Sequence, residues 1–303
     1  MVNNSNDNNN KDNIEEKRKS YIKTNRFRPI KLLDGIEEIK QDFEERIVHG
    51  DTTYGVEILD DAVETIRRGS ITAVIARPNT GKSLIGQNIA VHLSKQDKKV
   101  LICSCEMGAG LLMERQIRQL LGISTGELRK IYETQRDNAV ALMDELIIQD
   151  VYKYLNNIYI SETGGATVND IIELMNIFPE FEYVVIDYLQ RIRGSGTDYE
   201  NITHAFRELQ TFARSTGRKL IVCSQASRAK DDADPLTIKG KGSGSIEEDA
   251  DVGLTLSEAP TGYGQVKVIL FTLFKNRYGN IKNVTYKYEL TNRLTFKLLQ
   301  KGL

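Results

Sequence analysis

The sequence predicts an α/β fold, a mostly parallel twisted sheet that has helices on both faces and ends in antiparallel hairpins. Three observations predict this fold class. Short apolar segments alternate with amphipathic segments from about residue 70 to residue 224, the first apolar segment leads into a loop of the phosphate-binding type, and successive strand candidates follow Asp251. At 303 residues and 34.3 kDa, the chain has room for one large domain with extensions.

The alternating region supplies the parallel part of the sheet. Its strand candidates are short and apolar, and they cover residues 71–76, 100–104, 183–186 and 220–224. Amphipathic helix candidates lie between them, near residues 83–95, 109–121, 126–150, 168–178 and 202–216. Continuously apolar strands that alternate with helices are typical of a parallel sheet covered on both faces.

The region after Asp251 supplies the antiparallel part. Its strand candidates follow one another directly, at residues 252–257, 266–275, 283–289 and 294–298. Turns that contain Gly and Asn, such as Tyr278-Gly279-Asn280, separate them. Because strands joined by short turns of this composition pair as hairpins, we expect the sheet to end in antiparallel strands.

The first fifty residues differ in composition from the rest. Residues 1–29 begin with an Asn- and Asp-rich stretch and continue with a basic one, so we expect a disordered polar arm that is either solvated or in contact with nucleic acid. Residues 30–49 predict a linker helix. Its apolar residues recur at helical spacing and are Leu32, Ile36, Ile39, Phe43 and Ile47. This stripe packs either on a neighbouring protomer or on its own domain, which we assign to residues 50–303.

Charge and cysteine content narrow the functional class. The chain carries 41 basic and 42 acidic residues, so its net charge is close to zero. A surface that binds a polyanion therefore has to be a local basic region. The three cysteines, Cys103, Cys105 and Cys223, lie in apolar strand candidates, which favours buried reduced thiols over disulfides or a metal site. No segment has the length and apolarity of a membrane span or the core of a signal peptide. We therefore expect a cytoplasmic protein.

A phosphate-binding loop is predicted between the first strand and the helix that begins near Lys82. Gly81 lets the backbone come close to a phosphate, Lys82 can reach the β- and γ-phosphate oxygens, and the Ser83 hydroxyl suits Mg²⁺. Ala76 stands where the usual pattern has its first glycine. The residues expected to bind a nucleoside triphosphate are Ala76, Arg77, Pro78, Asn79, Thr80, Gly81, Lys82, Ser83 and Leu84.

Polar residues end the other parallel strand candidates, at the edge where open α/β sheets carry their chemistry. Glu106 follows the second strand and could act as a general base towards a water molecule. Asp187 follows the third and could hold Mg²⁺ through its water shell. Gln225 follows the fourth, where its amide could sense a γ-phosphate. Both carboxylates could instead serve only as helix caps or edge groups.

Six short motifs follow one another along the chain. They are Ala-Arg-Pro-x-x-Gly-Lys-Ser at 76–83, Ser-Cys-Glu-Met at 104–107, Ile-Asp-Tyr-Leu-Gln at 186–190, Ser-Gln-Ala-Ser-Arg at 224–228, Gly-Ser-Gly-Ser-Ile-Glu-Glu-Asp-Ala-Asp at 242–251 and Lys-Asn-Arg at 275–277. Together they resemble the helicase motifs of the DnaB-type replicative helicases. The resemblance covers residues 30–299 and implies a RecA-like P-loop ATPase fold.

The resemblance implies a role for each matching residue of the nucleotide site. Lys82 and Ser83 would hold the phosphates of ATP and Mg²⁺, and Glu106 would be the catalytic base. Asp187 would be the acid associated with Mg²⁺, and Gln225 would link the nucleotide state to the DNA loop that follows it.

The resemblance also implies residues that act between subunits and on DNA. Lys275 and Arg277 would reach the nucleotide site of the adjacent subunit, the arginine as a finger, whereas the residues alone also fit two solvated charges. Residues 227–245 would face DNA in a central channel or form an ordinary surface loop, and the Gly-rich residues 193–198 could also face that channel. The candidate DNA-binding residues are Arg228, Lys230, Lys239, Lys241, Gly242, Ser243 and Gly244.

Taken together, the resemblance implies an ATP-dependent helicase that forms a homo-oligomeric, hexameric ring, moves on single-stranded DNA and unwinds duplex during replication. The family's N-terminal collar domain has no match, so we expect a compact phage-like form with a separate primase or loader, in the host cytoplasm if phage-encoded. A RecA- or RadA-like recombination ATPase and an ATP-dependent module that regulates a host helicase are the alternatives.

Overall fold

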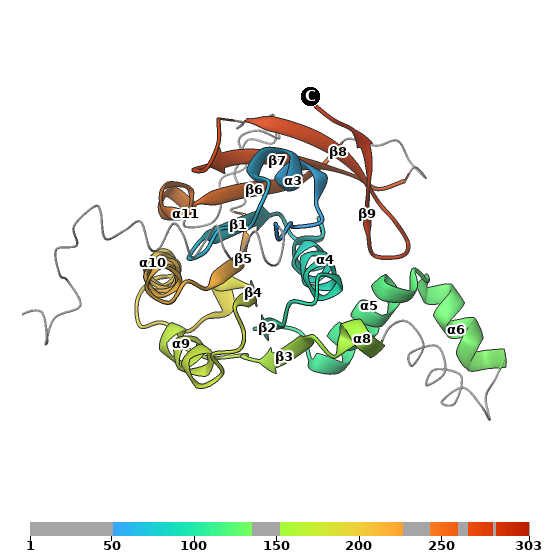
Figure 1. The fold of residues 1–303 in the computed structure, drawn as a ribbon, viewed down its shortest axis with the longest axis horizontal. Helices are drawn as coiled ribbons and strands as arrows, with labels where there is room; N and C mark the ends of the chain where they lie inside the picture. The colour runs from blue at the N-terminus through green and yellow to red at the C-terminus, as the bar shows by residue number, and fades with distance from the viewer. Residues whose placement is uncertain (1–50, 135–151, 227–242, 260–265, 281–282, 303) are drawn as a thin grey trace, which may run out of the picture. The chain divides into compact units, whose positions relative to one another are not determined.

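Nine strands form one sheet in the computed structural model, which describes residues 51–134, 152–226, 243–259, 266–280 and 283–302. The strand order is β3-β2-β4-β5-β1-β6-β7-β8-β9 (Figure 1). The strands are β1 (Ile71–Ala76), β2 (Val100–Ser104), β3 (Ile158–Glu162), β4 (Tyr183–Asp187), β5 (Lys219–Gln225), β6 (Val252–Glu258), β7 (Val268–Asn276), β8 (Val284–Leu290) and β9 (Phe296–Gln300). Pairing is parallel from β3 to β6 and antiparallel from β6 to β9, as the sequence predicts.

Helices cover both faces of this sheet. They are α3 (Glu57–Val63), α4 (Lys82–Lys95), α5 (Ala109–Leu121), α6 (Thr125–Thr134), α8 (Tyr152–Leu155), α9 (Val168–Ile177), α10 (Asp198–Thr216), α11 (Ser243–Asp249) and the 3-10 helix η3 (Leu189–Arg191). Residues of α3, α4 and α5 join one hydrophobic core, and residues of α9, α10 and α11 join the other. Figure 1 shows α4 and α9 on opposite sides of the parallel strands.

The alternation of side chains in β1 explains why five of its six residues are apolar; the exception is Thr72, which is buried and hydrogen-bonded to the Tyr54 hydroxyl at 2.8 Å. Val74 and Ala76 belong to the core under α4, whereas Ala73 and Ile75 belong to the core under α10. All six residues of β1 are buried, because a strand inside a parallel sheet has no solvent-facing side. The strand thus holds the loop that follows Ala76 at the centre of the sheet.

Several element boundaries differ from those expected. α10 begins at Asp198, not near residue 202, because the Thr197 hydroxyl and the Glu200 side chain form a capping box there. α6 begins at Thr125, one residue before the helix predicted at 126–150, and ends at Thr134; residues 135–150 of that prediction lie outside the described residues. The other predicted strands and helices differ by one or two residues at some ends.

Five elements were not anticipated, namely β3, α3, α8, α11 and η3. β3 lies at the edge of the sheet and is only partly buried, so it lacks the continuous apolar run of the inner strands. α3 has 7 residues, too few to show a helical repeat. α11 begins at Ser243 and therefore includes the end of the segment that we expected to be a loop up to residue 245.

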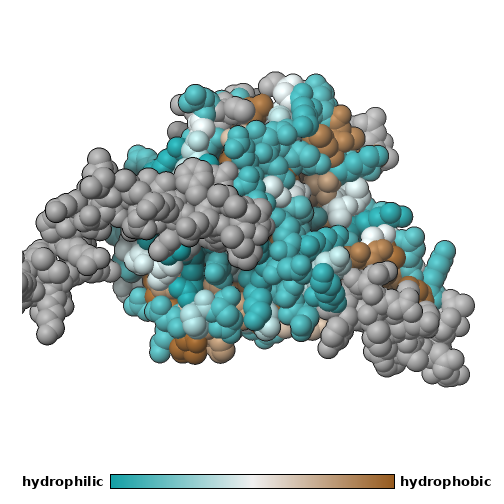
Figure 2. Space-filling view, viewed as in Figure 1, coloured by the Kyte–Doolittle hydropathy of each residue, from teal (hydrophilic) through white to brown (hydrophobic). Residues whose placement is uncertain are grey.

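The surface is largely hydrophilic on the face that Figure 2 shows, with separate hydrophobic patches near α9 and α5. Ile177 and Phe178 are exposed at the end of α9, as are Leu111 and Met113 on α5. Among the described residues, none of the helices has the length and apolarity needed to span a membrane. Cys103, Cys105 and Cys223 are buried free thiols, as predicted.

Candidate active site

The loop between β1 and α4 has the geometry of an anion-binding turn. The φ angles of Asn79 and Gly81 are positive, at 63° and 98°. The Thr80 backbone N–H and hydroxyl both donate to the Arg77 carbonyl, at 3.3 and 2.7 Å. Because Gly81 is the N-cap of α4, the first N–H groups of this helix, beginning at Lys82, have no intrahelical acceptor. The loop and helix therefore offer N–H donors and a positive dipole end to a phosphate.

The antiparallel end of the sheet packs against this loop. A Cβ atom at position 81 would lie 2.8 Å from Cζ of Phe296, a residue of β9. Gly81 is therefore required both by its backbone angle and by the space that Phe296 leaves. This contact joins the loop at the centre of the sheet to its last strand.

The Lys82 ammonium rests on an aromatic ring. Lys82 Nζ lies 3.0 Å from the centroid of the Tyr188 ring, which is a cation–π contact. Burial lowers the pKa of Lys82, and the negative charge of Asp187 opposes part of that shift. A triphosphate bound to the loop would give this ammonium a full negative charge as its partner.

Asp187 and Ser83 fit a divalent cation. The Ser83 hydroxyl is hydrogen-bonded to the Asp187 carboxylate, and Asp187 is 5% exposed. Asp187 Oδ1 is buried and has no hydrogen-bond partner among the described residues. Burial raises the pKa of Asp187, while the Ser83 hydrogen bond and the Lys82 charge oppose this shift. A buried carboxylate oxygen without a donor, beside a hydroxyl, suits the hydration shell of Mg²⁺.

Glu106 lies two residues after the end of β2 and is paired with an arginine. Arg191 Nη2 donates to Glu106 Oε1 at 3.1 Å, and Arg191 Nε donates to the Tyr188 hydroxyl at 3.0 Å. Both partners of the ion pair are about half exposed, at 53% for Arg191 and 47% for Glu106. The candidate base is thus held by a contact that solvent can replace.

Gln225 is positioned by a second glutamine. Gln190 Oε1 accepts from the Gln225 backbone N–H at 2.9 Å, and Gln190 Nε2 donates to Ser224 Oγ at 2.8 Å and to the Gln225 carbonyl at 3.1 Å. η3 therefore fixes the end of β5 through Gln190 and Glu106 through Arg191. We assigned no role from the sequence to Tyr188, Gln190 or Arg191, although the first two lie within one of the motifs.

A cavity of about 660 Å³ joins these groups. Glu106, Gln225 and the phosphate-binding loop line it, except for Thr80, whose side chain is buried. Asp187 is not part of the lining and approaches the cavity through Ser83. The volume lies within the range of small-molecule sites, about 300–1,000 Å³. The structure thus brings together the predicted phosphate, metal and base residues.

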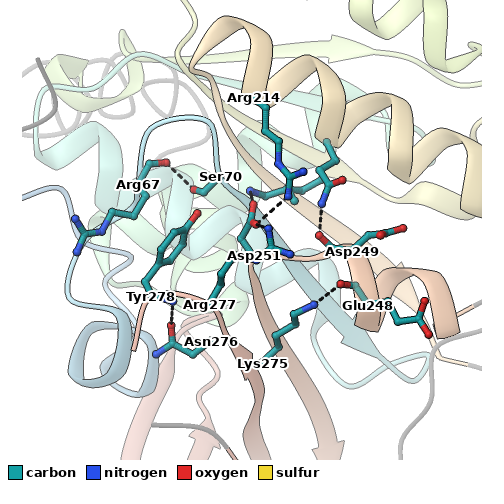
Figure 3. Close-up of polar contacts among 12 residues, drawn as sticks. Arg67, Ser70, Arg214, Glu248, Asp249, Asp251, Lys275, Asn276, Arg277 and Tyr278 are labelled. Carbon is teal, nitrogen blue, oxygen red and sulfur yellow. Dashed lines mark hydrogen bonds and ion pairs between the residues drawn. The ribbon is translucent and has the colours of Figure 1, made fainter. Parts of the chain in front are cut away.

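Lys275 and Arg277 lie far from this cavity, at the opposite end of β1. Arg277 Nη1 is 3.0 Å from Asp251 Oδ1 (Figure 3), and Asp251 Oδ2 accepts from the backbone N–H of Ile71, the first residue of β1. Lys275 Nζ donates to the Glu247 carbonyl at 2.9 Å. β1 spans about 17 Å at about 3.3 Å per residue. Arg277 is therefore not brought to the nucleotide cavity of its own chain.

Most candidate DNA-binding residues lie outside the described residues. These are Arg228, Lys230, Lys239, Lys241 and Gly242. Ser243 and Gly244 form the first turn of α11. Contact of all these candidate residues with DNA stays a prediction.

A family model described as the DnaB-like helicase C terminal domain matches residues 52–296. The replicative DNA helicase DnaC of Bacillus subtilis is 32% identical over 205 residues, which are 64% of this chain and 44% of that protein. DnaB of Geobacillus stearothermophilus gives the same figures of 32%, 64% and 44%. A probable plasmid replicative DNA helicase of Chlamydia muridarum is 27% identical over 246 residues, or 78% of this chain and 52% of that protein. The chain thus spans about half the length of these relatives.

Solved structures share the fold. A DnaB-like replicative helicase, described with its interactions with primase, superposes with a TM-score of 0.68 at 22% identity, over 90% of this chain and 68% of that one. A second solved structure, described as an ATPase domain, gives a TM-score of 0.68 at 24% identity, over 88% of this chain and 99% of that one.

Proposed function

Since this chain belongs to the DnaB-like helicase C-terminal domain family, we propose that it is a ring-forming DNA helicase that hydrolyses ATP to move on single-stranded DNA and unwind duplex during replication. One observation carries the proposal: the phosphate-binding loop, the buried Asp187 oxygen beside Ser83, and Glu106 converge on one cavity. This set serves phosphoryl transfer to water, which needs phosphate positioning and a base.

The residues divide the reaction between them. Loop N–H groups and Lys82 bind the phosphates, and Lys82 exchanges the Tyr188 ring for phosphate oxygens when ATP enters. Ser83 and Asp187 would hold Mg²⁺, which would neutralise phosphate charge when bound. Glu106 accepts a proton from the attacking water, so Arg191 must leave that carboxylate free at this step.

A second copy of the chain completes the site. Arg277 is separated from its own phosphate-binding loop by the length of β1, which favours contact with the nucleotide of a neighbouring subunit. There its guanidinium would stabilise the charge that develops in the transition state. This arrangement supports a closed ring, which we take to be a hexamer around single-stranded DNA. A helicase solved with primase among the structural neighbours supports a separate primase as partner, in the cytoplasm where replication proceeds.

Unwinding of a forked DNA substrate by the purified chain with ATP tests the proposal. We expect unwinding that depends on Mg²⁺ and stops in the Lys82→Ala variant, because the phosphates lose their cation. Strand exchange without unwinding would instead show a recombination ATPase. ATP and DNA binding with neither activity would show a binding module.

A further inference from the structure

Asp251 is a buried carboxylate shared by two arginines. It lies between α11 and β6, and its side chain is 3% exposed. Its Oδ1 atom is 3.0 Å from Arg277 Nη1 and 3.4 Å from Arg214 Nη2 of α10. The two arginine side chains are 45% and 49% exposed. Figure 3 shows both guanidinium groups converging on this one carboxylate.

The backbone around Asp251 is fixed on both sides. The Asp251 N–H donates to the Ile71 carbonyl at 3.0 Å, and the Ile71 N–H donates to Asp251 Oδ2 at 3.0 Å. The Arg277 N–H donates to the Asp251 carbonyl at 2.9 Å. The carboxylate is therefore anchored to the first residue of β1, the strand that carries the phosphate-binding loop at its other end.

Lys275 is engaged within its own chain. Its ammonium donates to the carbonyls of Glu247 and Glu248 in the last turn of α11. Figure 3 shows the contact with Glu248. Burial lowers the pKa of Lys275, and the Arg277 charge adds to this shift. Lys275 thus caps α11, the helix that leads into Asp251, whereas Arg277 remains half exposed.

We propose that Asp251 is a positioning residue that holds the Arg277 guanidinium in the orientation in which it enters the nucleotide site of a second copy of the chain. Lys275 supports it by fixing α11. The inference rests on the proposed function. An arginine without a partner samples many rotamers, and a donor that is already oriented stabilises the transition state without reorganisation. Because the guanidinium carries several N–H donors, it can contact Asp251 and a phosphate together.

Asp251→Asn removes the charge but keeps an acceptor for the Ile71 N–H. We expect its kcat for ATP hydrolysis to fall by about 10- to 100-fold, the effect of a catalytic group displaced by about 1 Å, while ATP affinity is unchanged. Asp249→Asn is the matched control, because Asp249 lies in the same segment but pairs with Arg207 at 2.9 Å. The control should keep wild-type kcat. Equal losses in both variants would overturn the proposal.

Mixed rings, verified by tagged subunits, distinguish a role across the interface from a structural one. Asp251→Asn mixed with Lys82→Ala should regain activity, because some interfaces then pair an intact Lys82 with an intact Asp251 and Arg277. Asp251→Asn mixed with Arg277→Ala should not, because no chain carries both residues intact. The reverse pattern would place the role of Asp251 in its own nucleotide site and refute the inference.

The reference mixture is Lys82→Ala with Arg277→Ala. If this mixture regains no activity, the proposed function is refuted in its claim that two chains share one nucleotide site. If this mixture regains activity but the two Asp251→Asn mixtures show the reverse pattern, only the inference about Asp251 is refuted. A thermal unfolding curve for each variant shows whether that variant is folded. If Asp251→Asn unfolds, Asp251→Glu, which keeps the charge and displaces it by one methylene, takes its place with the same expected pattern. A variant that folds and hydrolyses ATP at the wild-type rate overturns the inference.

Discussion

Gly81→Ala tests the link between the last strand and the phosphate-binding loop. At a φ of 98°, a left-handed backbone costs an alanine about 1–2 kcal/mol. Its Cβ would also lie 2.8 Å from Phe296 Cζ, and overpacking of this kind costs about 1–3 kcal/mol. The sum, about 2–5 kcal/mol, lowers the unfolding temperature by about 4–20 °C at about 2–4 °C per kcal/mol.

Gly122→Ala separates the two costs. Gly122 also has a positive φ, of 64°, but a Cβ there meets no atom within 4 Å, so the variant bears only the backbone cost. Calorimetry of both variants measures the difference, and titration with a fluorescent ATP analogue should show at least about tenfold weaker binding for Gly81→Ala alone, or about 1.4 kcal/mol. In a Phe296→Ala background, Gly81→Ala should lower the unfolding temperature by no more than Gly122→Ala does. Equal melting shifts for the two glycine variants, with unchanged ATP affinity, would refute the proposed packing.

Three further results are expected. Glu106→Gln should still bind ATP and DNA while single-turnover hydrolysis drops by about two to four orders of magnitude, and a rate within a few-fold of wild type would leave Glu106 a structural role. Deleting residues 1–29 should preserve ATPase activity. Deleting residues 1–48 should shift the protein from rings to monomers, as measured by sedimentation. Unchanged sedimentation of the longer deletion would mean that the linker helix packs on its own domain. Burial raises the pKa of Asp60 from 3.8 to about 6, so its contribution to stability is present below its unfolded pKa and is lost as pH rises through about 6. Urea unfolding of Asp60→Asn should lack this pH dependence between those values.

Hydrophobic pattern predicted the parallel strands β1, β2, β4 and β5, because nearly all of their residues are buried and most are apolar. The same rule failed for β3, whose edge position leaves none of its 5 residues fully buried. The first residue of α10 could also have been predicted from the sequence, because Thr197 and Glu200 have the spacing of a capping box.

The chemistry of the site was predictable only residue by residue. Strand ends indicated Glu106, Asp187 and Gln225, because parallel strands deliver their carboxyl ends to one edge. The pairing of Glu106 with Arg191 joins segments far apart in the chain, and no periodicity encodes it. The shared use of Asp251 by Arg277 likewise depends on strand pairing that only the folded sheet reveals.

The central position of β1 has a consequence for how the nucleotide site opens. β1 is hydrogen-bonded along its whole length to β5 on one side and to β6 on the other. Amide protons of such a strand exchange with solvent only when most of the sheet opens, whereas edge strands such as β3 and β9 exchange through local fraying. ATP at about 100 times its dissociation constant would stabilise the native state by about 2.7 kcal/mol. This stabilisation should therefore appear as about 100-fold slower exchange throughout the core strands, so that occupancy of the nucleotide site can be measured at amides far from it.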